Sequence, residues 1–227
     1  MTRLLVSVRS LEEALDAYDA GADLIDLKEP AAGPLGCVPP SVAVEVAARL
    51  GGRAPLSMAL GELRNAAARY ANECSFDQRN ASVGGVAVQE PAQEALDFTL
   101  IPATIAFAKL GLAGCAAVAD WPAHWTKAVG RLPASCAPVA VIYADWHAAN
   151  APSPTAVMAT AAEIGCRALL IDTFSKDAGG LFEHLQPSQL SELLTKARLQ
   201  NLVTVLAGSL TLNTAADALQ LQPDYLA

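Results

Sequence analysis

The sequence predicts a single (β/α)₈ barrel over residues 1–227, and three observations carry that prediction. Short apolar runs alternate along the chain with segments of helical periodicity, which is typical of parallel strands buried on both faces. Seven such runs and the start of an eighth are present, which favours a closed barrel over an open doubly wound sheet. No glycine-rich nucleotide-binding motif follows the first run, so a dinucleotide-binding sheet is further disfavoured.

The first strand and helix form a clear pair. Residues 3–8 (RLLVSV) are an apolar run of strand length. Ser10 and Glu13 follow with the spacing of a capping box, and a helical apolar stripe continues over residues 11–18. Gly21 then provides a helix stop. This order predicts a strand, a helix and a turn.

The next elements repeat the pattern until a long irregular interval. Residues 24–27 (LIDL) are the expected second strand, and a helix is expected over residues 41–50. Pro55 opens the third run, LSMAL, which closes at Gly61. Residues 62–102 are too long for a plain connection and too polar in the middle for core, so we expect an additional helix or hairpin there, or a mobile segment.

The second half of the chain alternates regularly. Each remaining apolar run is followed by a segment of helical periodicity until the chain ends. The expected strands are residues 104–109, 138–143, 168–172, 202–207 and 224–227, and the expected helices are residues 121–131, 155–164, 188–198 and 211–219. The eighth strand is therefore expected to be truncated at the C-terminus.

Composition limits the kinds of ligand. Apolar residues make up 53% of the chain and charged residues 17%, which is ample for a large core. The 23 acidic and 15 basic side chains give a formal net charge of -8. An open surface for nucleic acid or an anionic membrane is disfavoured on electrostatic grounds. An anionic small molecule would need a local group of cations.

The cysteines and the N-terminus favour a cytoplasmic protein. The cysteines are scattered, form no CxxC pair or metal-ligand cluster, and are expected to be reduced thiols. They are Cys37, Cys74, Cys115, Cys136 and Cys166. The segment MTRLLVSVRS lacks the shape of a secretory signal. Charged residues interrupt every apolar stretch that approaches ~18 residues, so no membrane span is expected.

Lysine is scarce and unevenly placed. The chain has only five lysines; Lys28 and Lys109 are expected to end apolar strands, and Lys176 lies four residues after Asp172. In a barrel such positions converge on one mouth, where enzymes of this fold place their chemistry. The acidic residues expected at the same strand ends are Asp26, Asp145 and Asp172. Structural ion pairs at the rim are the alternative, but the joint arrangement favours a site.

Lysine at such a site has a specific chemical use. A lysine amine that is partly desolvated and near a second cation loses its proton more readily, and the neutral amine can attack a carbonyl. Arginine stays protonated and cannot do this. The pair Gly208-Ser209, after the seventh expected strand, is a candidate phosphate-binding turn, because barrels often bind phosphate there through backbone N–H groups.

These residues also carry a resemblance to a known family. The segments concerned are LLVSVRSLEEA, GADLIDLKEPAAGPLG, FAKLGLAG, IYADW, IDTFSKDAGGLFEHL and LAGSL. In this order and spacing they resemble the (5-formylfuran-3-yl)methyl phosphate synthase family of methanofuran biosynthesis, from the first strand to the seventh. The most specific pieces are DLKEPxxGxLG at residues 26–36 and DTxxKDxG at residues 172–179. The family continues past the eighth strand into a segment containing glycine and arginine.

The resemblance implies a lyase that condenses two glyceraldehyde 3-phosphate molecules to a furan aldehyde phosphate, with loss of phosphate and water. It implies no metal or organic cofactor and a homo-oligomer. Lys28 resembles the Schiff-base lysine and Lys176 the acid–base lysine. The supporting polar set consists of Asp26, Lys109, Asp145 and Asp172. Two alternatives stay open at this point: another Schiff-base aldolase acting on a sugar phosphate, and a non-catalytic barrel that binds a phosphate ligand.

Overall fold

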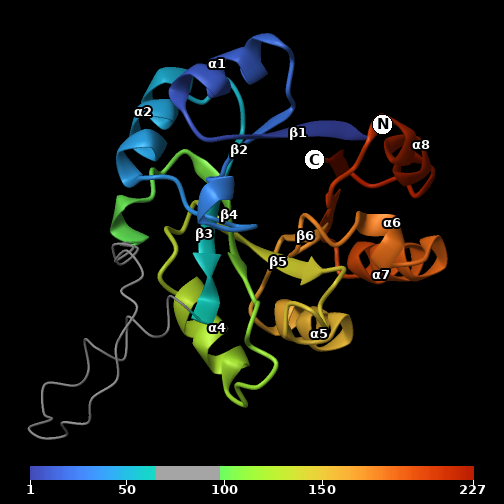
Figure 1. The fold of residues 1–227 in the computed structure, drawn as a ribbon. Helices are drawn as coiled ribbons and strands as arrows, with labels where there is room; N and C mark the ends of the chain where they lie inside the picture. Colours follow the sequence, from blue (N-terminus) through green and yellow to red (C-terminus); the bar gives the residue numbers. More distant parts are fainter. Residues whose placement is uncertain (65–97) are drawn as a thin grey trace, which may run out of the picture.

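The computed structural model describes residues 1–64 and 98–227, which form a closed barrel of eight parallel strands (Figure 1). The strands follow one another around the barrel in chain order, and β8 pairs with β1 to close it. The predicted (β/α)₈ fold is therefore confirmed. The helix or hairpin expected within residues 62–102 falls, for residues 65–97, outside the described part of the chain.

Each strand comes from one of the predicted apolar runs. The strands are β1 Arg3–Val8, β2 Leu24–Leu27, β3 Leu56–Glu62, β4 Ile105–Gly111, β5 Ala137–Tyr143, β6 Ala168–Asp172, β7 Val203–Leu206 and β8 Tyr225–Leu226. Two of them run further than predicted. β3 includes Glu62 and β4 continues to Gly111, so the expectation that Lys109 ends its strand is wrong.

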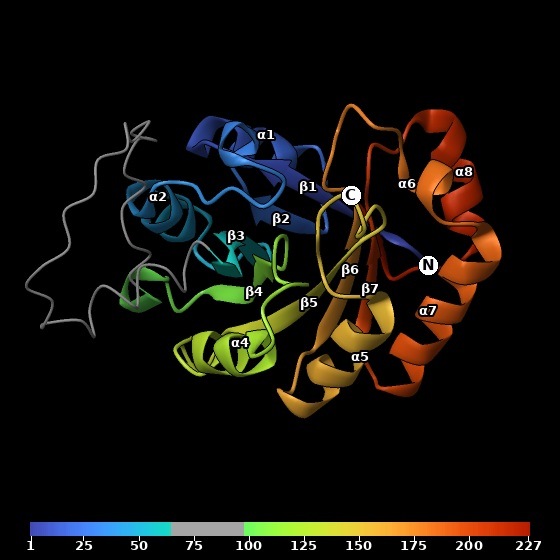
Figure 2. The ribbon, with the colours of Figure 1, turned by 60° about the horizontal axis from the view of Figure 1, so that its bottom comes forward.

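The helices lie outside the ring of strands, as Figure 2 shows for α4, α5, α7 and α8. They are α1 Leu11–Asp19, α2 Pro40–Leu50, α4 Trp121–Val129, α5 Pro154–Glu163, α6 Leu181–His184, α7 Pro187–Leu199 and α8 Leu212–Gln220. Short 3₁₀ turns occur at η1 Pro30–Ala32 and η2 Phe98–Leu100. The single-turn α6 and the 3₁₀ turns are too short to show a period in the sequence, which is why pattern reasoning missed them.

Side chains alternate between two apolar layers along each strand. One set packs inside the barrel and includes Leu5, Leu24, Val139, Val141, Leu170 and Val205. Their sequence neighbours pack against the helices and include Ile25, Ala140, Leu169, Ile171 and Leu206. Because successive side chains of a strand point to opposite faces, Asp26 shares the inner face with Leu24, and Asp172 shares it with Leu170. The strand period thus directs both carboxylates into the barrel.

Burial and helix length bear on two further expectations. Burial raises the pKa of the Cys115 and Cys136 thiols to about 11 and that of Cys166 to about 12, which makes them poor nucleophiles. The expected reduced state of Cys74 concerns a residue outside the described ranges.

Within residues 1–64 and 98–227, no helix has the length and apolar character needed to cross a membrane.

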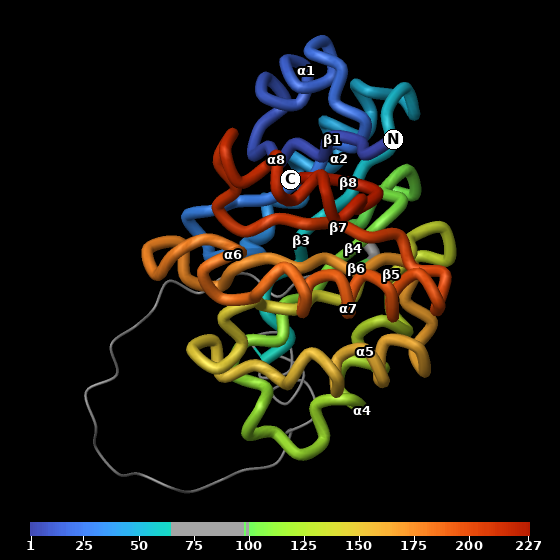
Figure 3. Tube along the Cα trace, turned by 90° about the vertical axis from the view of Figure 1, so that its right-hand side faces the viewer, coloured from blue at the N-terminus to red at the C-terminus, as the bar shows by residue number. Residues whose placement is uncertain are grey.

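A side chain reinforces the closure of the barrel at the two-residue strand β8. Asp224 precedes β8, and one of its carboxylate oxygens accepts hydrogen bonds at 2.8 Å from both the backbone N–H and the hydroxyl of Thr204 in β7. The backbone carbonyl of Asp224 accepts a 2.9 Å bond from the N–H of Arg3 in β1. Asp224 therefore ties both neighbours of β8 together where the chain ends meet (Figure 3).

We expect Asp224→Ala to lower the free energy of unfolding by about 1–3 kcal/mol, because it removes the acceptor for the N–H and O–H donors of the fully buried Thr204. Chemical denaturation measures this change. The control is Asp217→Ala on the exposed face of α8, expected to stay within about 0.5 kcal/mol of the parent. Equal losses in the two variants would contradict the role given to Asp224.

Candidate active site

Asp26 is the centre of a buried polar network inside the barrel. Its side chain is almost fully buried, and it accepts hydrogen bonds from the Ser57 hydroxyl at 2.6 Å and the Ser7 hydroxyl at 3.1 Å. The ammonium group of Lys109 donates to the same carboxylate and forms an ion pair with it. The four residues come from β1, β2, β3 and β4, which are consecutive around the barrel. A buried charge pair of this kind needs such additional hydrogen bonds to offset desolvation.

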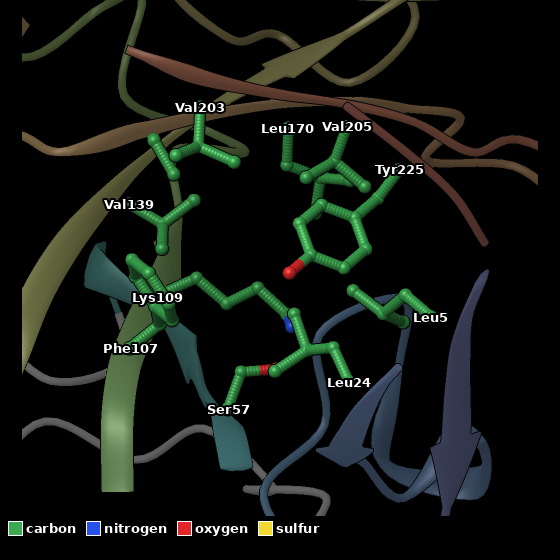
Figure 4. A pocket seen from close by; sticks show the side chains of 11 residues that line it. Leu5, Leu24, Ser57, Phe107, Lys109, Val139, Leu170, Val203, Val205 and Tyr225 are labelled. Atoms are coloured by element: carbon green, nitrogen blue, oxygen red, sulfur yellow. The ribbon is translucent and has the colours of Figure 1, made fainter. Parts of the chain in front are cut away.

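Lys109 lies deeper than the sequence suggested. Because β4 continues for two residues after it, its side chain extends from within the strand into the lumen (Figure 4). It is 5% exposed and borders a cavity of about 30 Å³, together with Tyr225 and Ser57. That space suits water rather than a phosphate ester. The cavity is therefore too small for a phosphate ester.

At the mouth, the carboxylate of Asp172 lies between Lys28 and Lys176. Asp172 is the last residue of β6 and is 2% exposed. Its Oδ1 accepts a hydrogen bond from the Lys176 Nζ at 2.8 Å, and its Oδ2 lies 3.6 Å from the Lys28 Nζ. The Lys28 side chain is 15% exposed and that of Lys176 is 45% exposed. One buried carboxylate thus holds a shielded amine and an open amine beside each other.

Asp145 holds the loop that carries Lys176. It is 6% exposed, and its two carboxylate oxygens accept hydrogen bonds from the backbone N–H groups of Phe174 at 2.7 Å and Ser175 at 2.9 Å. Lys176 also donates to the carbonyl of Thr173 at 2.7 Å. In the described part of the chain Asp145 therefore contacts backbone amides instead of a lysine. Its place in the site is to fix the loop after β6.

The turn at Gly208-Ser209 lies beside the same loop. The carbonyl of Gly208 accepts a 2.9 Å hydrogen bond from the Leu181 N–H. A Cβ atom at Gly208 would lie 3.0 Å from the Thr173 side chain, so this turn packs closely on the loop that bears Lys176. Gly208 and Ser209 have φ values of 102° and 52°. Successive backbone N–H groups in such turns can form a concave anion site.

Two residues that the sequence did not single out complete the mouth. The Tyr143 hydroxyl donates to Oε1 of Glu62 at 2.5 Å, and the Ala113 N–H donates to Oε2 at 2.8 Å. Burial raises the pKa of Glu62, although both hydrogen bonds act in the opposite direction. Burial, followed by the charge of Glu62, raises the pKa of Tyr143 well above its usual range, so this hydroxyl remains a donor.

The turn after β2 has little freedom to change. It contains Lys28, and its Glu29 N–H donates to the Gly36 carbonyl at 2.9 Å. A Cβ at Gly36 would lie only 2.1 Å from the Glu29 carbonyl oxygen, so a side chain does not fit there. Leu35 is buried in the inner apolar layer, and its carbonyl accepts a 2.8 Å bond from the Gly61 N–H. The pattern at residues 26–36 thus describes a loop packed onto the mouth.

No group of three or more histidine, cysteine, aspartate or glutamate side chains in residues 1–64 and 98–227 has a geometry suited to a metal ion. The charged groups described at the mouth include the lysines, the carboxylate of Asp172 that contacts two of them, and the carboxyl groups of Asp145 and Glu62. This arrangement can bind anions and form imines. It can also move protons between neighbouring groups.

Comparison with known proteins identifies relatives over nearly the full chain. The family model described as 4-HFC-P synthase matches residues 4–227. The (5-formylfuran-3-yl)methyl phosphate synthase of Archaeoglobus fulgidus is 26% identical, with 99% of this chain and 87% of that protein covered. The protein of the same name from Methanosarcina mazei is 28% identical at the same coverage. A Methylorubrum extorquens protein is 33% identical, covering 99% of this chain and 79% of its own.

Solved structures support the fold alone. Phosphoribosyl anthranilate isomerase from Thermotoga maritima superposes with a TM-score of 0.55 at 14% identity, covering 100% of this chain and 86% of that chain. The isomerase from Thermus thermophilus gives a TM-score of 0.52 at 17% identity, covering 99% and 86%. These likenesses extend over the whole barrel.

The Asp26–Lys109 pair predicts a non-additive effect on stability. Lys109→Met leaves the Asp26 carboxylate buried without a cation, and we expect a loss of about 3–5 kcal/mol in the free energy of unfolding. Adding Asp26→Asn removes the unpaired buried negative charge, so the double variant should be more stable than Lys109→Met. Denaturant titrations measure both, with Lys196→Met, which breaks only an exposed pair, as the control. A double variant less stable than Lys109→Met would contradict the ion-pair assignment.

Proposed function

Because the chain belongs to the 4-HFC-P synthase family, we propose that it condenses two molecules of glyceraldehyde 3-phosphate to (5-formylfuran-3-yl)methyl phosphate through a Schiff base on Lys28. The reaction releases phosphate and water, which makes the enzyme a lyase. The observation that carries the proposal is the cluster of Lys28 and Lys176 on the single buried carboxylate of Asp172.

Lys28 is the better placed nucleophile of the two. Its side chain is the more shielded one, and Asp172 lies near enough to take up a proton when the amine becomes neutral. The neutral amine attacks the carbonyl carbon of the first triose phosphate, and loss of water from the adduct gives an iminium. The iminium acidifies the adjacent carbon. Removal of a proton there yields an enamine that attacks the second triose phosphate.

Lys176 has the features of a proton carrier. Its ammonium group is anchored by Asp172 and Thr173, yet nearly half of its side chain is exposed and can exchange protons with water. In the proposal it gives and takes protons during isomerisation, aldol addition and dehydration. Asp145 supports this work by holding the loop. Asp26 and Lys109 form a buried ion pair beneath the two reacting lysines.

The phosphate groups are assigned to the mouth. In the proposal a substrate phosphate lies at Gly208-Ser209, because successive backbone N–H groups of a turn with positive φ can form a concave anion site. The lysines attract the doubly charged substrates to this end of an otherwise acidic protein.

We expect Lys28→Arg to abolish furan formation and borohydride trapping, because arginine keeps the charge but offers no neutral amine. Lys176→Arg should also lose turnover, by about 100-fold or more, yet still form a reducible adduct at Lys28. Absorbance of the furan and the mass of the protein after incubation with glyceraldehyde 3-phosphate and borohydride measure the two effects. Lys196→Arg, an exposed position on α7, is the control.

The outcomes separate the proposal from its alternatives. Wild-type trapping at Lys176 would exchange the two lysine roles. Trapping with a simple aldol product, and no furan, would identify another Schiff-base aldolase. The absence of both trapping and turnover would point to a barrel that only binds a phosphate ligand.

A further inference from the structure

An extra residue in β3 turns Glu62 into the barrel. Along the β3–β4 ladder Ala59 pairs with Lys109, but Glu62 pairs with Gly111, so three steps on β3 match two on β4. Gly61 supplies this bulge with a φ of 81°. Ala59 belongs to the inner apolar layer, so strict alternation would send residue 62 outward. A bulge resets the alternation and re-aims the next side chain.

The carboxyl group of Glu62 is held by two hydrogen bonds and packs closely against the backbone of Gly111. Tyr143 and the Ala113 N–H each donate to one of its oxygens. A Cβ atom on Gly111 would lie 2.1–2.4 Å from the carboxyl atoms, so the strand passes close only because residue 111 has no side chain. Tyr143 is 1% exposed, whereas Glu62 is partly exposed. The glutamate is therefore the member of the pair that a ligand can reach.

This pair adjoins the lysine cluster. Tyr143 is the last residue of β5 and is the register partner of Asp172, the last residue of β6. The charge of Asp172 contributes to raising the pKa of Tyr143. The ring of Phe174, from the loop that carries Lys176, packs edge-on against Tyr143 at 5.4 Å between centroids. Glu62 and the two lysines thus lie on two sides of the same strand end.

The proposed dehydration, in which Lys176 transfers protons, needs a second acid–base group. The lysines act at the carbonyl and at the carbon next to it, but loss of a hydroxyl group as water also needs a proton donor at the departing oxygen. A carboxyl group in a desolvated site can keep its proton nearer neutral pH than an exposed one. Glu62 has that environment.

We propose that Glu62 is a further acid–base residue that protonates the hydroxyl oxygen leaving as water, and that Tyr143 is its positioning residue. This inference rests on the proposed function. A lysine removes the proton on the neighbouring carbon, and the electron pair of that C–H bond forms the C=C bond. The C–O bond breaks with its electrons on oxygen, and the proton from Glu62 completes the water. The lysine then releases its proton to solvent, and Glu62 regains a proton from solvent.

The test compares Glu62→Gln with Glu163→Gln, an exposed position on α5. We expect Glu62→Gln to lower the rate of furan formation by about 100-fold while borohydride still traps substrate on Lys28. The trapped protein should accumulate an adduct of two trioses that is heavier than the wild-type adduct by the mass of retained water. Glu163→Gln should match the wild type in rate and adduct.

The pH profile distinguishes proton transfer from a structural effect. An acid works only while it holds its proton, so the wild-type rate should fall as pH rises through the pKa of Glu62, and this limb should be missing in Glu62→Gln. Tyr143→Phe removes a hydrogen bond that lowers the pKa of Glu62. Its alkaline limb should therefore move to higher pH, with the fold checked by thermal unfolding.

The outcomes test the role of Glu62 and the role of Tyr143 separately. A Glu62→Gln enzyme that makes furan at the wild-type rate, or that loses trapping together with turnover, would overturn the role of Glu62 and leave the proposed function standing. A Tyr143→Phe profile unmoved on the pH axis would overturn the role of Tyr143. A wild-type enzyme that forms no furan would overturn both the proposed function and the inference.

Discussion

The carboxylate of Asp172 is the group on which the rest of the mouth depends. It is buried at the end of β6, and its two oxygens lie against different lysines from different loops. If it were absent, the ammonium groups of Lys28 and Lys176 would repel each other without this anion between them. Its position follows from the strand period, which places residue 172 on the same inner face as Leu170. The position of this carboxylate is therefore a consequence of the strand period.

Two layers of charge are stacked along the barrel. The lower layer pairs Lys109 with Asp26 inside the lumen, while the upper layer places Lys28 and Lys176 on Asp172. Three ammonium groups thus meet these two carboxylates, while the carboxyl groups of Asp145 and Glu62 accept hydrogen bonds from backbone N–H groups and from Tyr143. The lower pair is fully enclosed and has little freedom, whereas the upper layer reaches solvent. The buried ion pair therefore lies beneath two lysine amines that are more exposed to solvent.

The barrel and two of the lysines at its mouth could be predicted from the sequence for a clear physical reason. Apolar runs buried on both faces are visible in a sequence, and parallel strands end at one rim, so Lys28 and Lys176 could be placed together before any coordinates. The sequence did not indicate that Lys109 lies inside β4 and not at its end, because the two residues after it are compatible with either strand or loop. Glu62 was missed because a bulge overrides alternation, and Tyr143 because it reads as one more apolar strand residue. These features depend on pairing between strands that are distant in the sequence.

The bulge at Gly61 also affects how family members should be aligned. Most substitutions at this point would alter the side chain but leave the three-against-two pairing of β3 and β4 in place. Deletion of a single residue between Ala59 and Glu62 would make two steps on β3 match two on β4, so ordinary alternation would keep the glutamate on the inner face. Loss of the bulge without a deletion would instead turn residue 62 to the helix layer. A gap in this column of an alignment would therefore mark relatives that direct an acid into the mouth without a bulge.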